Sequence, residues 1–428
     1  MTIEKFQPAK YAQSILQSKT LIYKPNDGLY EYLHDKGYWK PIHGTYVESI
    51  ALTRLGDSAV TSRLIDIRKL VERSCLFPDD RDFNDIKGLL NVKNGMFYIQ
   101  TKNLVPHHEV YHSTIQLKVN YNPAAKCPRW EQFLVEVFEG DPERIALIQE
   151  FMGYSLVPDT RYEKALLMIG EGANGKSTLI KVWEQLLGPE NISSVTLPNL
   201  QNQFHRVTLH RKLVNMAAEL NSMTVNQSDY FKRIVSGDTI DAAHKLKPVF
   251  SFRPYARLVF AMNRMPQVKD TSHGFYRRLI LVPFNRKFEG KYADKNLLDK
   301  LLAELDGIFL WALEGLERLY RNDGFTEPQS SRSTLAKYRR ANNPLVAFVE
   351  DCCKLDLDAN SKKDDLYKTF KDYCTGCGYP LASENEFFKE LYAAYSTLKP
   401  ARLGPREMRD HYVKGIKMVE TVSEAASG

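Results

Sequence analysis

The stretch "GEGANGKST" at residues 170–178 decides the fold of this chain. Gly170 and Gly175 bracket a loop whose backbone N–H groups can turn toward phosphate oxygens, and Lys176 and Ser177 complete the phosphate-loop pattern. The apolar run "ALLMI" leads directly into the loop, and "STLIKVWEQLLG" continues from it with helical periodicity. This strand-loop-helix context predicts a nucleotide-binding loop rather than a chance match in a glycine-containing turn.

The predicted loop would take ATP and Mg²⁺ as its cofactors. In this interpretation the Lys176 ammonium pairs with the β- and γ-phosphates, and the Ser177 hydroxyl is a ligand of Mg²⁺. The backbone of the loop cradles the phosphates at a helix N-terminus. The predicted nucleotide-binding residues are Gly170, Gly172, Asn174, Gly175, Lys176, Ser177 and Thr178.

Three further apolar runs come after the loop: "KLVNMAAE" (212–219), "RLVFAMN" (257–263) and "RLILVPF" (278–284). Each is short and uncharged in its interior, as is typical of strands buried on both faces of a sheet that helices cover. An amphipathic helical region follows at 296–320. We therefore expect an α/β nucleotide-binding core.

Two polar residues close these runs where a catalytic site needs them. Hydrolysis requires an acidic group beside the metal and the attacking water. Glu219 ends the first of the three runs, and because Ala217 and Ala218 precede it, it would both support Mg²⁺ and polarise water. Asn263 closes the next run and would orient the lytic water. Solvated strand-end residues are the alternative interpretation of both.

Two arginines precede the last apolar run. Arg277 and Arg278 could present a guanidinium to a γ-phosphate, either within the chain or across a subunit interface. An arginine supplied in this way contributes ~10³ or more to the rate. A surface ion pair is the alternative.

Two basic segments are candidate nucleic-acid contacts. Residues 242–257 carry five basic side chains between aromatic ones and no acid, as suits a hairpin that grips a phosphate backbone. The tail at 396–417 would suit a wing that touches duplex DNA, although solvated basic strands explain both segments as well. The predicted DNA-binding residues are His244, Lys245, Lys247, Arg402, Arg406 and Arg409, and the first segment also holds Arg253 and Arg257.

Composition indicates a protein of a reducing cytoplasm. The formal net charge of +7 allows an anionic partner, and the six cysteines are too few and too scattered for a secreted disulfide framework. We expect buried thiols rather than a zinc site. The N-terminus lacks an apolar signal region, and no run of 18 apolar residues occurs, so we expect neither export nor a membrane span.

Taken together, the motifs resemble those of the superfamily 3 (AAA+) DNA helicases of phages, plasmids and large DNA viruses, in particular the phage/plasmid and poxvirus primase-helicase group. The resemblance rests on "GEGANGKST", "NMAAEL", "FKRIVSGDTI", "FAMNRMP" and "GFYRRLILVPF", in that order. It implies an AAA+-like ring, usually a hexamer, that moves along single-stranded DNA with 3′-to-5′ polarity and unwinds the duplex.

The resemblance also implies roles for single residues. Lys176 and Ser177 match the phosphate-loop pair, Glu219 the acidic motif and Asn263 the polar sensor. Arg278 matches the inter-subunit arginine finger better than Arg277 does. Lys245, with His244 beside it, falls where related viral helicases place DNA-gripping residues on a pore hairpin, although this match is looser.

Three domains are expected. Residues 1–125 would form an α-rich accessory domain, 126–322 the ATPase domain with a preceding helical collar, and 340–428 a winged-helix domain after a polar linker at 321–334. Many relatives carry an N-terminal primase domain, which the chain has no room for, so priming is not expected. A lone Glu219 in place of two adjacent acids resembles the phage and poxvirus branch.

We therefore expect an ATP-dependent replicative DNA helicase of a phage or mobile genetic element, working as a homo-oligomeric ring on single-stranded and forked DNA in the cytoplasm of a bacterial host. A separate primase or polymerase is left open as a partner. The alternative is an origin-binding or loading ATPase that uses ATP as an assembly switch. A small-molecule kinase is disfavoured because the chain offers basic aromatic hairpins rather than an evident acceptor pocket.

Overall fold

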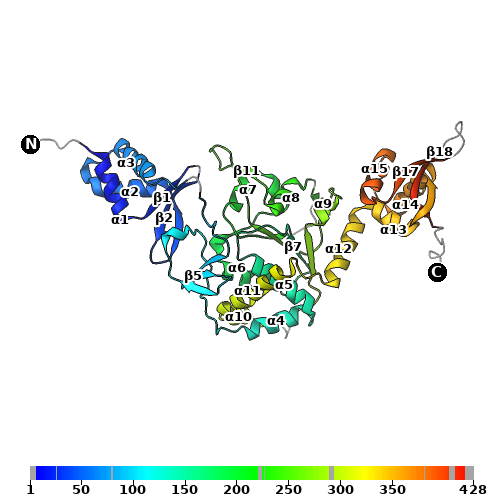
Figure 1. The fold of residues 1–428 in the computed structure, drawn as a ribbon, viewed down its shortest axis with the longest axis horizontal. Helices are drawn as coiled ribbons and strands as arrows, with labels where there is room; N and C mark the ends of the chain where they lie inside the picture. Colours follow the sequence, from blue (N-terminus) through cyan, green and yellow to red (C-terminus); the bar gives the residue numbers. More distant parts are fainter. Residues whose placement is uncertain are drawn as a thin grey trace, which may run out of the picture.

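A computed structural model describes residues 6–25, 27–78, 81–219, 224–225, 227–288, 294–379, 381–403 and 410–419, without the side chains of residues 219, 224 and 225. The chain is elongated, with an N-terminal lobe at one end, a C-terminal lobe at the other, and a large sheet-containing core between them (Figure 1).

The core is built on a parallel sheet of five strands. The strands are β7 (Ala165–Ile169), β8 (Ile192–Ser193), β9 (Val214–Glu219), β13 (Arg257–Met262) and β15 (Leu279–Pro283), in the order β15-β7-β13-β9-β8. The four apolar runs are thus confirmed as strands. All six residues of the central β13 are buried, as parallel strands covered on both faces should be.

Helices cover both faces of this sheet (Figure 1). Five helices pack on the first face and share one hydrophobic core with the sheet: α4 (Pro128–Phe138), α5 (Pro142–Tyr154), α6 (Lys176–Leu187), α10 (Leu297–Leu302) and α11 (Leu305–Asn322). The helices α5 and α11 approach closely, because a Cβ on Gly153 would lie 2.2 Å from the Ala312 carbonyl oxygen. The opposite face holds α7 (Gln203–Arg206), α8 (Asp229–Ser236), α9 (His273–Tyr276) and α12 (Gln329–Asn342).

Small strand pairs complete the core. The strands β11 (Ile240–Ala242) and β12 (Phe250–Phe252) form an antiparallel hairpin on the connection between β9 and β13. The strands β10 (Thr224–Val225) and β14 (Gln267–Val268) pair in parallel. The hairpin is therefore carried by the segment in which the sequence predicts it.

The N-terminal region is richer in strands than the α-rich domain that the sequence predicts. Its helices are α1 (Pro8–Ser18), α2 (Gly44–Leu55) and α3 (Thr61–Ser74), and its first antiparallel sheet holds β1 (Leu21–Lys24), β2 (Gly28–Leu33) and β3 (Tyr38–Ile42). A second sheet of β4 (Leu89–Val92), β5 (Gly95–Tyr98) and β6 (Asn103–Val105) shares the hydrophobic core of α4, α5, α6 and α11, where Leu90 and Phe97 are buried. Short strands with mixed patterning explain why the helices dominated the prediction.

The C-terminal lobe has a core of its own. Its elements are α13 (Pro344–Cys352), β16 (Cys353–Lys362), α14 (Lys363–Cys377), α15 (Glu384–Ala394), β17 (Lys399–Leu403) and β18 (Asp410–Met418), with the antiparallel sheet order β16-β18-β17. The polar segment 321–334, expected as a linker, is partly helical, because α12 begins at Gln329. The Tyr338 hydroxyl on α12 donates to the Pro266 carbonyl at 2.8 Å, so this helix packs on the core that holds the parallel sheet.

Of the helices in the described ranges, none is both long and apolar enough to cross a membrane.

Candidate functional site

The phosphate loop lies at the carboxyl edge of the central sheet, between β7 and α6. Two of its glycines have a positive φ, 97° at Gly172 and 87° at Gly175. A Cβ on Gly175 would lie 2.7 Å from Cγ2 of Val137, and one on Gly170 would lie 2.4 Å from the Phe284 carbonyl oxygen. The glycines are therefore needed for the turn and for the close packing of the loop against α4 and the end of β15.

Lys176 is buried inside its own loop. Its ammonium donates to the Gly170 carbonyl and, at 2.9 Å, to Oδ1 of Asn174. The Asn174 amide in turn donates to the Phe284 carbonyl at 3.1 Å. Burial lowers the pKa of Lys176, since the charged form is poorly solvated there. The lysine is thus prepared to exchange two loop acceptors for a stronger anionic one.

A cavity of about 330 Å³ opens in front of the loop. Asn263, which is exposed at the residue after β13, faces this cavity together with Ser177 and Thr178. The structure therefore brings the predicted loop and the predicted sensor to one site. The remaining lining residues are Arg129, Phe133, Glu136, Gly172, Ala173, Asn174, Gly175, Lys176, Phe288, Asp294 and Leu297.

Glu219 is the last residue of β9, and its backbone pairs with Met262 of β13. Met262 pairs on its other side with Ile169, the last residue of β7. The ends of the three strands are therefore level at the carboxyl edge, beside the phosphate loop. The Glu219 side chain lies outside the described part of the chain.

Arg277 and Arg278 lie at the opposite edge of the sheet. They precede β15, whose first residue, Leu279, pairs with Ala165 at the start of β7. A strand rises ~3.3 Å per residue, so five residues of β7 separate the arginines from the loop by roughly 16 Å. Neither arginine lines the cavity in front of the phosphate loop.

The two arginines differ in how they are held. Arg277 is 44% exposed and pairs with Glu163 at 2.7 Å. Arg278 is only 12% exposed and donates to the Ser236 hydroxyl at 2.7 Å and the Gly274 carbonyl at 2.6 Å. Burial, with a smaller contribution from neighbouring Arg277, lowers the pKa of the Arg278 guanidinium. Arg278 also pairs with Glu163, at 3.1 Å. The Ser236 and Gly274 contacts therefore give Arg278 a fixed, mostly buried position, whereas Arg277 is the more exposed of the two.

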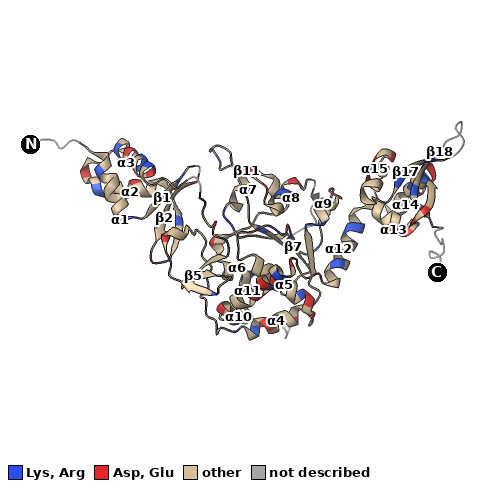
Figure 2. Ribbon diagram, in the orientation of Figure 1, with Lys and Arg blue, Asp and Glu red and all other residues tan. Residues whose placement is uncertain are grey.

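The basic hairpin projects its tip from the layer of helices above the sheet (Figure 2). His244, Lys245 and Lys247 are exposed there, and Leu246, which has a φ of 62°, is fully exposed between the lysines. The His244 ring stacks on Phe250 of β12, with centroids 6.2 Å apart and planes 17° apart. These three predicted DNA contacts therefore share one accessible turn.

Arg257 does not belong to this basic surface. It is the first residue of β13 and is buried, with its guanidinium carbon 4.6 Å from the centroid of the Tyr154 ring. Its Nη1 donates to the Leu213 carbonyl at 3.3 Å. The prediction that Arg257 is part of the basic hairpin is wrong, because the strand that follows the hairpin starts at this residue. Arg253 remains exposed.

The C-terminal candidates are only partly described. Arg402 is exposed on β17, whereas Arg406 and Arg409 lie outside the described residues. The neighbouring helix α15 begins with a capping box of Ser383 and Glu386. That helix holds three glutamates and one lysine, so it offers little positive charge to a phosphate backbone.

Some cavity residues were missed by the sequence reasoning. Arg129 and Phe133 are four residues apart on α4, and Phe288 and Asp294 follow β15, so these segments meet only in the fold. The helical spacing of the first pair was visible in the sequence. That α4 packs on the loop was not.

Comparison with known protein families gives three matches on separate parts of the chain. The family described as "D5 N terminal like" matches residues 9–139, and "Poxvirus D5 protein-like" matches 340–397. The "Family of unknown function (DUF5906)" matches 168–278, which contain the phosphate loop and both arginines. The two D5 matches flank the match that contains the phosphate loop.

Curated relatives come from large DNA viruses. The chain is 26% identical over 240 residues to the "Putative helicase L207/L206" of Acanthamoeba polyphaga mimivirus, covering 49% of this chain and 25% of that protein. It is 26% identical over 174 residues to the "Putative helicase 022R" of Frog virus 3 (isolate Goorha), covering 37% of this chain. The chain spans only 25% and 17% of the length of these two relatives.

Among solved structures, an apo form of the NrS-1 C terminal region superposes with a TM-score of 0.60 at 12% identity, covering 96% of this chain and 100% of that one. At this identity the likeness concerns the fold. The family matches and the viral relatives show that separate parts of this chain are similar to D5-type proteins and to viral proteins named as putative helicases.

Proposed function

We propose that this chain is a superfamily 3 (AAA+) ATPase that unwinds DNA as a ring. One observation carries the proposal: the phosphate loop and Asn263 line one cavity at the carboxyl edge of a parallel sheet. The connection between β9 and β13 carries an exposed basic hairpin. A nucleotide at the cavity and a nucleic acid at the hairpin would then be joined by two neighbouring strands.

In the proposed reaction, Lys176 leaves the Gly170 carbonyl and Asn174 to contact the β- and γ-phosphates of ATP. The exposed Ser177 hydroxyl, at the start of α6, fits a Mg²⁺ ligand, and bound Mg²⁺ would neutralise phosphate charge. Glu219 polarises the attacking water and Asn263 orients it. Arg129, which pairs with Glu136 at 3.4 Å, lies beside the site that the rest of the nucleotide would occupy.

The distance between the two edges of the sheet favours an arginine supplied by a neighbouring subunit. Arg278 cannot reach a γ-phosphate roughly 16 Å away across β7, even with its side chain extended. Its fixed position suits a group that completes another subunit's site. This is the physical reason to propose a closed ring, with a hexamer as the form that the family resemblance implies.

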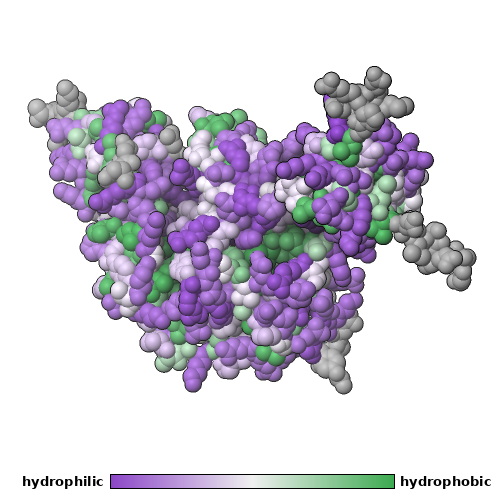
Figure 3. Space-filling model, turned by 45° about the vertical axis from the view of Figure 1, so that its right-hand side comes forward, coloured by the Kyte–Doolittle hydropathy of each residue, from purple (hydrophilic) through white to green (hydrophobic). Residues whose placement is uncertain are grey.

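A groove beside the edge strand β15 supports such assembly. It has a volume of about 450 Å³ and is lined by apolar residues of β15, by Tyr276 and Phe325, and by Arg277 at its border. Figure 3, turned so that this side comes forward, shows a recessed hydrophobic area below the C-terminal lobe. A neighbouring subunit that covers this groove would lie against Arg277, which lines it.

The biological setting follows from the resemblance: replication of a phage or mobile element in a bacterial cytoplasm, with 3′-to-5′ movement on one DNA strand. The C-terminal lobe has the element order helix-strand-helix-helix-hairpin, which supports a winged helix. Since α15 is acidic, we expect the C-terminal lobe to contact DNA through the predicted wing residues Arg402, Arg406 and Arg409 instead. This lobe is also what the alternative, an origin-binding loader, would use.

ATP-dependent unwinding of forked duplexes with a 3′ or a 5′ single-stranded tail tests the proposal. We expect the wild-type protein to unwind the substrate with the 3′ tail and Lys176→Ala to unwind neither. Lys181→Ala is a matched control, because Lys181 is exposed on the same helix and does not line the cavity. ATP hydrolysis without unwinding on either tail would contradict the helicase and favour the loader.

A further inference from the structure

A second groove, outside the nucleotide cavity, runs between the N-terminal lobe and the ATPase core. Its volume is about 950 Å³. One wall is β3, with Tyr38 and Lys40, and the other is the edge strand β8 with the segment that holds His205, Lys212 and the polar Thr208. The groove ends at His244, the first exposed residue of the basic hairpin. It is therefore continuous with the hairpin.

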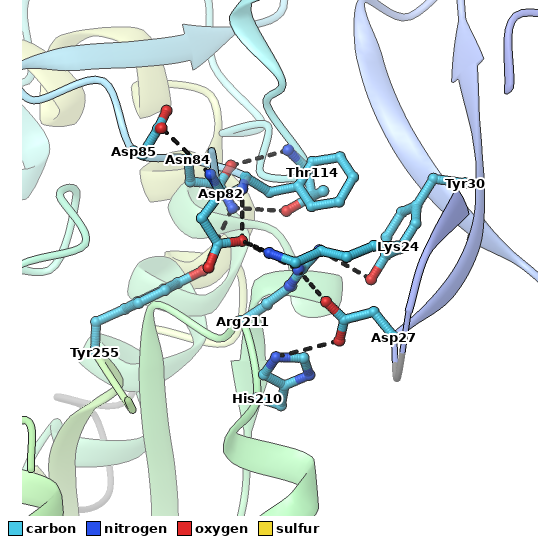
Figure 4. A network of polar contacts seen from close by, with 11 residues as sticks. Lys24, Asp27, Tyr30, Asp82, Asn84, Asp85, Thr114, His210, Arg211 and Tyr255 are labelled. Atoms are coloured by element: carbon cyan, nitrogen blue, oxygen red, sulfur yellow. Dashed lines mark hydrogen bonds and ion pairs between the residues drawn. The ribbon is translucent and has the colours of Figure 1, made fainter. Parts of the chain in front are cut away.

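The walls of this groove are held together by a polar network (Figure 4). Arg211 of the ATPase core donates to Asp27 and, at 2.9 Å, to the Tyr30 hydroxyl of the N-terminal lobe. Its guanidinium also contacts Asp82 at 3.3 Å and lies 4.3 Å from the centroid of the Phe83 ring. Because several hydrogen bonds of Arg211 cross this junction, they fix the two walls of the groove relative to each other.

The charges within this network balance one another, so the net charge of the groove depends on the other ionisable groups that line it. Arg211 is balanced by Asp27 and Asp82. Among the described residues that line the groove, Glu190 is the one acid, and the Lys118 ammonium pairs with it. Lys40, His205 and His244 are exposed in the groove, and Lys212 donates to the Glu190 carbonyl. The lining is therefore net positive.

We propose that this groove binds single-stranded nucleic acid and extends the path of the strand that the basic hairpin holds. Positive side chains suit the phosphates, the half-buried Tyr38 offers a ring on which a base can stack, and the exposed Ser194 after β8 can donate a hydrogen bond. Stacking requires unpaired bases, which favours a single strand over a duplex. The proposal rests on the proposed function, because it deepens the same nucleic-acid path.

The test uses the full chain and oligo-dT of increasing length. Lys40→Glu, alone and with His205→Glu, places negative charge in the groove at two exposed positions. We expect about tenfold weaker binding of long oligo-dT for the double variant, with a shallower salt dependence, and little change for oligomers too short to leave the hairpin. Lys69→Glu is the matched control, because Lys69 is an exposed lysine of α3 in the same lobe that does not line the groove.

Photo-crosslinking gives a readout that does not depend on the variants. Oligonucleotides of 5-iodo-deoxyuridine should crosslink to the peptide that contains Tyr38. The inference is overturned if long and short oligomers respond alike to Lys40→Glu, if no crosslink maps to β3, or if a blunt duplex crosslinks there as well as a single strand. If the groove crosslinks but the protein unwinds no DNA, the helicase function is rejected and the nucleic-acid groove is retained. If the protein unwinds DNA but the groove does not crosslink, only the nucleic-acid groove is rejected.

Discussion

The two edges of the central sheet are built from the same strands but hold opposite halves of the proposed catalytic site. The carboxyl edge gathers the phosphate loop, Asn263 and the end of β9 around one cavity. The amino edge holds Arg277 and Arg278, separated from that cavity by the length of β7. The difference teaches that, in the proposed mechanism, one chain would carry every group for ATP hydrolysis but could not bring them together alone. Activity should then depend on the contact between chains.

The largest expected effect comes from removing the phosphate-loop lysine at the carboxyl edge of the sheet. Lys176→Ala removes the ammonium that would contact the β- and γ-phosphates, and we expect ATP hydrolysis to fall to the background. Tight nucleotide binding should be lost with it, as measured by fluorescence of a labelled ATP analogue. Lys181→Ala should behave as wild type. Full hydrolysis by Lys176→Ala would break the assignment of this edge.

The next effect comes from the amino edge. Arg278→Ala should slow hydrolysis by ~10³ while leaving nucleotide binding intact, because the arginine acts on the transition state of another subunit's ATP. Arg277→Ala should cost far less, since Arg277 is 44% exposed, whereas Arg278 is 12% exposed and is held by Ser236 and Gly274. Measurement of hydrolysis and binding on the same preparations separates the two arginines.

Mixing the two inactive variants tests the comparison directly. Lys176→Ala retains Arg278, and Arg278→Ala retains a complete nucleotide cavity, so mixed rings should recover part of the hydrolysis. The recovery should follow the statistics of random mixing and vanish on dilution below the concentration that assembles the ring. Equal inactivity of the mixture and its parts would mean that both residues serve one chain.

The sequence predicted the carboxyl edge better than the amino edge, and the reason is physical. A phosphate loop is local, since Gly172, Gly175 and Lys176 form it within a few residues, and strand ends can be read from short apolar runs. The position of Arg278 depends on which strands are neighbours, and no local pattern states that β15 lies beside β7. The residues alone therefore left open whether Arg278 acts within its own chain or on a neighbouring chain.

Two misses show the same limit. Arg257 looked like part of a basic hairpin, but the strand begins there and buries the side chain over Tyr154. The segment 321–334 looked like a linker from its polar composition, yet α12 begins inside it and packs on the core through Leu335 and Tyr338. Composition cannot reveal a helix with only a few contact residues on one face.

Acid should weaken the junction of the N-terminal lobe before it affects either edge of the sheet. Burial lowers the pKa of His210 to about 4, and its Nε2 lies 3.6 Å from Oδ1 of Asp27. The unfolded chain binds this proton more readily, so the stability given by the neutral ring is present above about pH 6.5 and is lost as the pH falls toward 4. The loss should be at most about 3 kcal/mol.

The midpoint of urea unfolding between pH 7 and pH 4 measures this effect. His210→Gln should flatten the pH dependence in that window, because no imidazole is left to take up the proton. His205→Gln is the matched control, because His205 is exposed. His43 would not serve, since its side chain caps α2. An unchanged slope in His210→Gln would show that other groups cause the acid sensitivity.

The smallest effect concerns the helix that supports both edges. The Tyr338 hydroxyl on α12 donates to the Pro266 carbonyl, in the segment that returns from Asn263 toward Arg277, and its ring contacts Tyr276 at 5.9 Å between centroids. Tyr338→Phe keeps the ring contact and removes the hydrogen bond, so we expect a loss of about 1 kcal/mol in the free energy of unfolding. ATP binding should not change, because α12 does not line the nucleotide cavity. Slower hydrolysis at unchanged binding would instead mean that α12 positions Arg278, which would make the amino edge more dependent on its support than the carboxyl edge is.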